Sequence, residues 1–135
     1  MRWLVKEEPS SYSFADLQRD GRTVWAGVRN ALAQQHLRAM KPGDRVFYYH
    51  TGREKAVVGI ATVATGPRPD PADATGKLQM VELAPVQRLK APVTLAAIKA
   101  DPTFADFALV RISRLSVMPV TDLEWAAIEA MSRRP

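Results

Sequence analysis

The chain has 135 residues and a mass of 14.9 kDa, which suits one domain over residues 1–135 and excludes two independent cores. It contains no cysteine, which excludes disulfides, zinc–thiolate sites and iron–sulfur clusters and suits a reducing cytosol. The net charge of +5 favours polyanionic partners, and residues 1–67 carry +4 of it (10 Lys and Arg against 6 Asp and Glu).

The sequence predicts a cytoplasmic protein without a membrane segment. The apolar run at the start is too short for a signal peptide and turns acidic at Glu7 and Glu8. No stretch approaches the roughly 20 apolar residues that span a bilayer. A monomer is the expected state.

The first half of the chain alternates between extended and helical patterns. In chain order we expect a strand over 2–6 ended by Pro9, a helical turn over 13–17 capped by Ser13, a turn at Asp20-Gly21, an amphipathic helix over 30–40, and an aromatic strand over 46–50.

The second half of the sequence predicts strands and short helices that are interrupted by prolines. We expect a strand over 56–64, a loop of roughly a dozen residues from Pro67, a strand over 78–89 with an edge or bulge at Pro85, short helices over 94–99 and 104–109, a strand over 110–118, and a helix from Thr121 through Met131.

These helices are too short and irregular to cover both faces of a doubly wound sheet. The pattern therefore favours an α+β fold, in which a mostly antiparallel, curved, barrel-like sheet carries short peripheral helices.

The sequence lacks the common catalytic and cofactor motifs. Only His36 and His50 could ligate a metal, and no paired-acid spacing completes a site. Glu7 and Glu8 are adjacent in a strand, so their side chains point to opposite faces and cannot form one acid/base dyad. Phosphate-binding loops and serine elbows are absent. We expect a protein that is not an enzyme and has no cofactor, no metal and no catalytic residue.

The segment around Trp25 is the first candidate for binding. Trp25 offers a face on which a base can stack, or it is a core residue that packs against the following helix. Asn30 carries the donor and acceptor that read a base edge, and it would equally cap the helix. Arg29 contacts a phosphate or pairs with an acid.

Two strands supply the other candidates. Lys6 and Glu8 lie two residues apart, so they share one strand face and either contact a base or neutralise each other. Tyr48 and His50 share a face of the aromatic strand, where they line a pocket or where His50 is a satisfied structural residue.

Three segments in register resemble the EVE domain, a member of the PUA-like superfamily. They are Trp3–Leu17, Trp25–Thr51 with its Trp25-Ala26-Gly27-Val28-Arg29-Asn30 start, and Leu109–Val120. Glu7 departs from the small hydroxyl residue that is usual there, and Ala26 from an acidic or polar one. Thr51 replaces serine and keeps the hydroxyl.

The resemblance implies a PUA-like fold and a pocket for a modified base, in DNA or in RNA, with methylated or hydroxymethylated cytosine as the ligand class. The residues expected to bind the ligand are Lys6, Glu8, Trp25, Val28, Arg29, Asn30, Tyr48, His50 and Thr51. The alternatives are an RNA-binding module that acts on structured or modified RNA, and an enzyme that uses the same pocket on a free nucleotide.

Overall fold

The computed structural model describes residues 1–134, which form one six-stranded sheet with short helices around it. The strand order is β2-β5-β4-β3-β1-β6. The strands are β1 (Arg2–Glu7), β2 (Thr23–Trp25), β3 (Arg45–His50), β4 (Ala56–Pro69), β5 (Gln79–Thr94) and β6 (Val117–Pro119).

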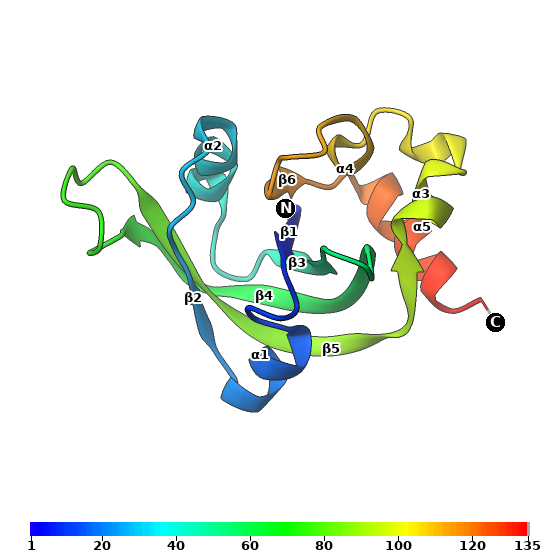
Figure 1. The fold of residues 1–135 in the computed structure, drawn as a ribbon, viewed down its shortest axis with the longest axis horizontal. Helices are drawn as coiled ribbons and strands as arrows, with labels where there is room; N and C mark the ends of the chain where they lie inside the picture. The colour runs from blue at the N-terminus through cyan, green and yellow to red at the C-terminus, as the bar shows by residue number, and fades with distance from the viewer. Residues whose placement is uncertain (135) are drawn as a thin grey trace.

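The sheet is mixed but mostly antiparallel. Within residues 1–134, β1 and β3 are the one pair that runs parallel, and the other four neighbouring pairs are antiparallel. The long strands β4 and β5 curve across the molecule and give the sheet the shape of a half-barrel (Figure 1). This confirms the predicted α+β class with a curved sheet and short helices.

The helices lie on both sides of β4 and β5. They are α1 (Phe14–Asp20), α2 (Ala31–Ala39), α3 (Leu95–Lys99), the 3-10 turn η1 (Pro102–Phe104), α4 (Ala108–Arg111) and α5 (Asp122–Ser132). Helix α1 lies below β4 and β5 in Figure 1, whereas α2 and the group from α3 to α5 lie above them, at opposite ends. None of the helices within residues 1–134 is long and apolar enough to cross a bilayer.

Local sequence signals explain the helix boundaries. The Ser13 hydroxyl accepts from the Asp16 N–H while the Asp16 carboxylate accepts from the Ser13 N–H, and Thr121 and Glu124 repeat this reciprocal cap at α5. Gly21 ends α1 with a φ of 77°, which glycine adopts without a steric cost.

The core lies between the sheet and the helices. The ring of Phe47 stacks on Trp125 of α5 with centroids 3.6 Å apart. On the α1 side, Phe14 packs so close to Gly59 that a Cβ there would lie 2.5 Å from its ring. The predicted bulge at Pro85 is confirmed, because Ala61 pairs with Pro85 and Ile60 with Gln87, which leaves Val86 without a partner.

Three predicted elements need correction. The short helix predicted over 104–109 is instead two separate elements, because η1 ends at Phe104 and α4 begins at Ala108. The strand predicted over 110–118 is wrong: the N–H of Ile112 donates to the carbonyl of Ala108, so this part of the chain continues α4, and only Val117–Pro119 is extended. The loop predicted from Pro67 begins later, because β4 pairs with β5 as far as Pro69.

Candidate functional site

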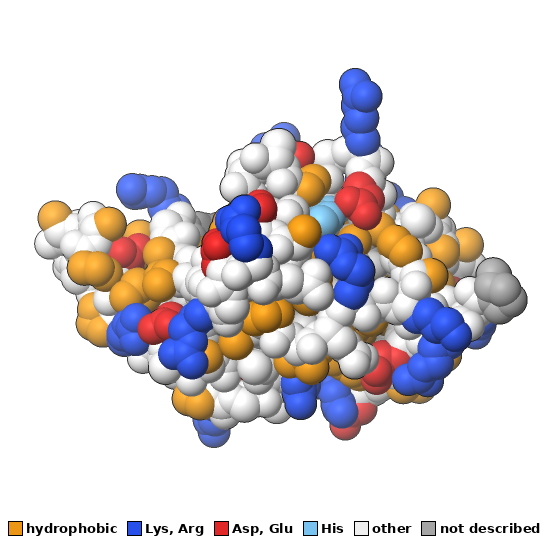
Figure 2. Space-filling view, turned by 90° about the horizontal axis from the view of Figure 1, so that it is seen from below, with side chains coloured by type: hydrophobic (Ala, Val, Ile, Leu, Met, Phe, Trp, Pro, Cys, Tyr) orange, Lys and Arg blue, Asp and Glu red, His pale blue; other side chains and the backbone are white. Residues whose placement is uncertain are grey.

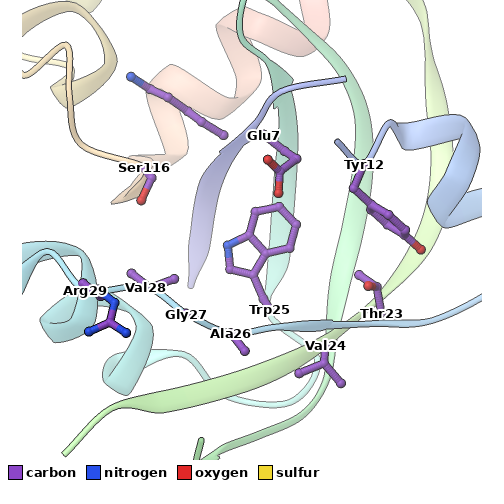
Figure 3. A pocket seen from close by; sticks show the side chains of 11 residues that line it. Glu7, Tyr12, Thr23, Val24, Trp25, Ala26, Gly27, Val28, Arg29 and Ser116 are labelled. Carbon is purple, nitrogen blue, oxygen red and sulfur yellow. The ribbon is translucent and has the colours of Figure 1, made fainter. Parts of the chain in front are cut away.

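A cavity of about 430 Å³ opens beside β2, between the end of β1 and the start of α2. Figure 3 shows the indole of Trp25 at its centre, with Glu7 above it, Tyr12 and Thr23 on one side, and Val28, Arg29 and Ser116 on the other. The lining residues are Lys6, Glu7, Tyr12, Thr23, Val24, Trp25, Ala26, Gly27, Val28, Arg29 and Ser116. We call this the Trp25 cavity.

Trp25 is positioned by the edge of the sheet and by an aromatic residue beneath it. Backbone pairing with Val81 of β5 fixes its main chain. The ring of Tyr48 meets the indole edge-to-face, at 82° and with centroids 5.6 Å apart. Trp25 is 7% exposed, so the indole is buried except where it borders the cavity. The result is a rigid aromatic wall.

The segment after Trp25 is held by two buried polar side chains. Gly27 has a φ of 73°, and its N–H donates to Oδ2 of Asp70, which is 4% exposed. Gln34 of α2 is 2% exposed, and its amide donates to the carbonyl of Val28 at 2.7 Å. These two hydrogen bonds fix the backbone that forms the floor of the cavity.

Glu7 provides the acidic group of the cavity. Its Oε1 accepts from the N–H of Glu8 at 2.9 Å, and its Oε2 has no hydrogen-bond partner within residues 1–134. Figure 3 shows the carboxylate pointing toward the indole of Trp25. Burial first, and then the charge of Glu7, raise the pKa of the Tyr48 hydroxyl beneath. The cavity therefore presents a free carboxylate oxygen next to an aromatic surface.

Some of the other polar groups at the rim already have a hydrogen-bond partner. The Tyr12 hydroxyl donates to Asp20 at 2.7 Å, and burial together with this hydrogen bond raises the pKa of Tyr12. Thr23 and Ser116 supply further hydroxyls, and Arg29 is exposed at the edge without an ion-pair partner in the described chain.

The structure brings four of the nine predicted ligand residues together at the Trp25 cavity: Lys6, Trp25, Val28 and Arg29. Asn30 lies just outside, where its side-chain oxygen accepts from the N–H of Ala33 and caps α2. The Asn30 oxygen therefore caps the helix, which is the structural one of the two roles predicted for this residue.

Tyr48 and His50 lie in the core instead of lining the cavity, which corrects the prediction for both. Tyr48 is fully buried, and its hydroxyl donates to the carbonyl of Tyr12 at 2.6 Å. In His50, Nε2 accepts from the N–H of Phe14 at 3.0 Å, so Nδ1 carries the proton and faces Glu54 at 2.8 Å. Both side chains are structural supports.

Glu8 and Thr51 also lie away from the cavity. Strand β1 ends at Glu7, and the carbonyl of Glu8 accepts from the N–H of Ser11 and Tyr12 in a turn. The Thr51 hydroxyl donates to the Glu8 carboxylate at 3.3 Å. Glu8 therefore does not share a strand face with Lys6, and the ion pair that was the structural alternative for these two residues is absent from residues 1–134.

Seven lining residues were not predicted as ligand contacts: Glu7, Tyr12, Thr23, Val24, Ala26, Gly27 and Ser116. A signal for Glu7 exists in the sequence, since it departs from the small hydroxyl residue that is usual in its motif. Nothing in the local sequence marks Thr23 as a lining residue, because a strand of three residues carries no periodicity. Ser116 is not marked either, since it reaches the site from a distant part of the chain.

Charge does not locate the site. Figure 2 shows Lys and Arg side chains spread over one face with acidic side chains between them. Within residues 1–134 no group of three or more His, Cys, Asp or Glu could hold a metal ion. The lining of the Trp25 cavity places an aromatic ring beside a carboxylate and hydroxyl groups, and these groups can bind a flat, polar heterocycle.

Several solved structures share the fold of this chain. A solved protein of Rhodopseudomonas palustris is 48% identical with a TM-score of 0.93, covering 97% of this chain and 92% of that one. The ASCH protein of Zymomonas mobilis, 14% identical with a TM-score of 0.66 over 96% of this chain and 94% of that one, shows a likeness of fold alone, which is PUA-like.

Human thymocyte nuclear protein 1 is 27% identical over an alignment of 166 residues. The alignment covers 98% of this chain and 74% of that protein. Its crystal structure in complex with 5-methylcytosine-containing DNA aligns with a TM-score of 0.91 at 26% identity, over 99% of this chain and 98% of that one. The EVE domain model matches residues 1–131, and the chain therefore belongs to the EVE domain family.

Proposed function

We propose that this protein binds a modified base of DNA, of the methylated or hydroxymethylated cytosine class, in the Trp25 cavity. The observation that carries the proposal is the indole of Trp25, which borders a cavity large enough for a small-molecule ligand and is held rigidly from beneath by Tyr48. A base that stacks on an aromatic side chain gains about 1–3 kcal/mol.

Glu7 favours bases that carry an exocyclic amino group. Its free Oε2 is an acceptor, and the N4 amino group of cytosine is a donor. Thymine and uracil present a carbonyl oxygen at the same position, which a carboxylate repels. The carboxylate therefore supports cytosine over the other pyrimidines.

The remaining lining groups suit a substituent at the ring edge and the backbone beside it. Val28 supplies apolar surface for a methyl group, and the hydroxyls of Thr23 and Ser116 suit a hydroxymethyl group. Arg29 is exposed and suits a phosphate. A methyl group in a fitted pocket adds only about 1–3 kcal/mol, so we expect modest selectivity.

The relatives support DNA as the polymer. Human thymocyte nuclear protein 1 was crystallised with DNA that contains 5-methylcytosine, and it shares this fold over nearly the whole chain. A base in a duplex must leave the stack before it can enter the cavity, which costs a few kcal/mol. Stacking, the carboxylate contact and phosphate contacts would offset that cost.

Binding without chemistry is part of the proposal. The residues that line the Trp25 cavity include no histidine and no cysteine, and both nitrogens of His50 are engaged by Phe14 and Glu54. Within residues 1–134, no hydrogen bond links the hydroxyl of Thr23 or Ser116 to the Glu7 carboxylate, which accepts from the N–H of Glu8.

A titration tests the proposal. Oligonucleotides that differ only in cytosine, 5-methylcytosine or 5-hydroxymethylcytosine at one position are titrated against the wild type and against Trp25→Leu, which keeps apolar bulk and removes the stacking surface. We expect the modified bases to bind more tightly, and Trp25→Leu to weaken binding by about 5- to 150-fold, the equivalent of 1–3 kcal/mol.

Equal affinity for the three bases would contradict the proposal. The same sequences as RNA form the second arm, and tighter binding of the RNA would favour an RNA-binding module instead. Mass spectrometry of nucleosides that copurify with the protein identifies the base directly.

A further inference from the structure

A second cavity, of about 270 Å³, adjoins the Trp25 cavity on the other side of Lys6. Lys6 is the residue that lines both. The residues that line the second cavity are Lys6, Tyr49, Thr51, Gly52, Lys55, Leu95, Lys99, Leu109, Val110 and Ser113. We call it the lysine cavity, because Lys6, Lys55 and Lys99 surround it.

One short loop separates the two cavities and is fastened to Lys6. The backbone N–H of Lys6 donates to the carbonyl of Ser116, which lines the Trp25 cavity. The Lys6 ammonium donates to the carbonyl of Ser113 at 2.8 Å, and Ser113 lines the lysine cavity. The two cavities thus share Lys6 as a lining residue, and these two hydrogen bonds hold the 113–116 segment between them.

The three ammonium groups have no ion-pair partner within residues 1–134. Lys6 is half-buried and lies 5.9 Å from the centre of the Tyr49 ring, and burial lowers its pKa. Like charges that converge on one cavity repel each other unless an anion lies between them. The lining residues include three lysines and no acid, and the Glu8 carboxylate reaches the wall at the Thr51 hydroxyl, so the cavity carries a positive balance of charge.

The backbone holds Lys55 at this position at a steric cost. Lys55 has a φ of 44°, in the left-handed region where glycine is the usual residue. Its carbonyl accepts from the N–H of Leu95 at 2.8 Å, which fixes it against the start of α3. Strained residues of this kind concentrate at ligand sites, where the surrounding structure maintains them.

We propose that the lysine cavity binds a backbone phosphate of the same nucleic-acid strand whose base enters the Trp25 cavity. This inference rests on the proposed function. The ammonium groups of Lys55 and Lys99 contact the phosphate oxygens, and the side chains of Leu95 and Leu109 accommodate the carbons of the adjoining sugar. The position of Lys6 in both walls makes one strand a simpler occupant than a separate anion.

The test separates phosphate contacts from base contacts. The double variant Lys55→Gln, Lys99→Gln and the control Lys90→Gln are compared with the wild type. All three lysines are exposed, and Lys90 lines neither cavity. The ligands are 5-methyl-2′-deoxycytidine, which has no phosphate, and a single-stranded trinucleotide with 5-methylcytosine at its centre.

We expect the double variant to bind the trinucleotide on the order of tenfold more weakly, with the slope of log K against log salt reduced by about 0.7 for each phosphate that the protein no longer neutralises. Its affinity for the nucleoside should equal that of the wild type, and Lys90→Gln should resemble the wild type with both ligands. Inorganic phosphate should shift the amide resonances of Lys55 and Ser113 in the wild type and not in the double variant.

Two failures are distinguishable. If the trinucleotide binds in a Trp25-dependent way but the double variant matches Lys90→Gln, the phosphate site is wrong and the proposed function stands. If the wild type binds neither the nucleoside nor the trinucleotide, the proposed function fails and this inference fails with it. An equal loss for the nucleoside and the trinucleotide in the double variant would also overturn the assignment to phosphate.

Discussion

The backbone N–H of Gly27 donates to Oδ2 of Asp70, across 43 residues of sequence and a distance of 3.1 Å. The other oxygen of the same carboxylate accepts from the N–H of Ala72 at 2.9 Å. Because Asp70 follows the end of β4, the β4–β5 loop holds the floor of the Trp25 cavity in place. Asp70 itself does not line the cavity, so its role there is to position the backbone.

Removing this carboxylate should loosen the cavity. Asp70→Ala removes the acceptor of two backbone N–H groups, and a hydrogen bond contributes about 0.5–1.5 kcal/mol net to stability. We expect a lower free energy of unfolding in urea and faster hydrogen exchange at Gly27. Asp106→Ala removes an exposed carboxylate and should change stability by less than about 0.5 kcal/mol. Unchanged exchange at Gly27 would contradict the role of Asp70.

Gln34 should be the most sensitive polar position of α2. Its amide donates to the carbonyls of Val28 and Gln79 and accepts from the N–H of Gln79. Gln34→Met preserves volume but leaves these buried groups unpaired, so we expect a loss of at least about 2 kcal/mol in chemical denaturation. The exposed neighbour Gln35 gives the matched control, Gln35→Met. Similar stabilities of the two variants would show that the Val28 segment does not depend on this amide.

Glu7 should set the preference of the Trp25 cavity for a base that carries an exocyclic amino group. Glu7→Gln replaces the charged acceptor with an amide that can also donate, so we expect the preference for cytosine over thymine to fall about tenfold, which corresponds to 1.4 kcal/mol. Competition binding with matched oligonucleotides measures it. Glu8→Gln changes the same group one residue away, outside the cavity, and should leave the preference intact. A preference that survives Glu7→Gln would exclude Glu7 from base recognition.

Asp73 should make the β4–β5 loop sensitive to strong acid. Hydrogen bonds from the N–H groups of Leu78, Thr75 and Lys77, with the Thr75 hydroxyl, lower the pKa of Asp73 from 3.8 to about 2. Since the pKa is lower in the folded protein, its stabilising contribution is complete above about pH 4 and is lost as the pH falls through about 2.

Amide chemical shifts of Leu78 and Lys77, followed from about pH 5 to about pH 1.5 by NMR, should report that transition. Asp73→Asn should move these resonances toward their acid positions already at neutral pH. Titration of the two amides near the ordinary carboxyl pKa of about 4 would show that the carboxylate does not hold the loop.

Local signals account for most of what the sequence predicted. The caps at Ser13, Asn30, Thr94 and Thr121 each appear where a small polar side chain precedes a helix, since the contact that makes a cap spans only three residues. The bulge at Pro85 follows from the missing N–H of proline in a strand.

The site was harder to predict because tertiary contacts decide it. Whether Tyr48 faces a ligand or the core depends on Trp25 and Tyr12, which cover it from other parts of the chain. Strand alternation suggested Glu8 as the acidic group, but the turn after β1 moves the Glu8 side chain to Thr51 and leaves Glu7 at the cavity. No periodicity in the sequence contains that information.

The order of the strands governs when the Trp25 cavity can exist. Strand β1 lies between β3 and β6, so the wall that joins Glu7 to Ser116 unites two segments more than a hundred residues apart. A nascent chain still attached to the ribosome cannot close that wall until residues 116–119 have emerged and paired with β1. We expect fragments that end before Val117 to lack this wall of the cavity and to bind the ligand more weakly than the chain that includes β6.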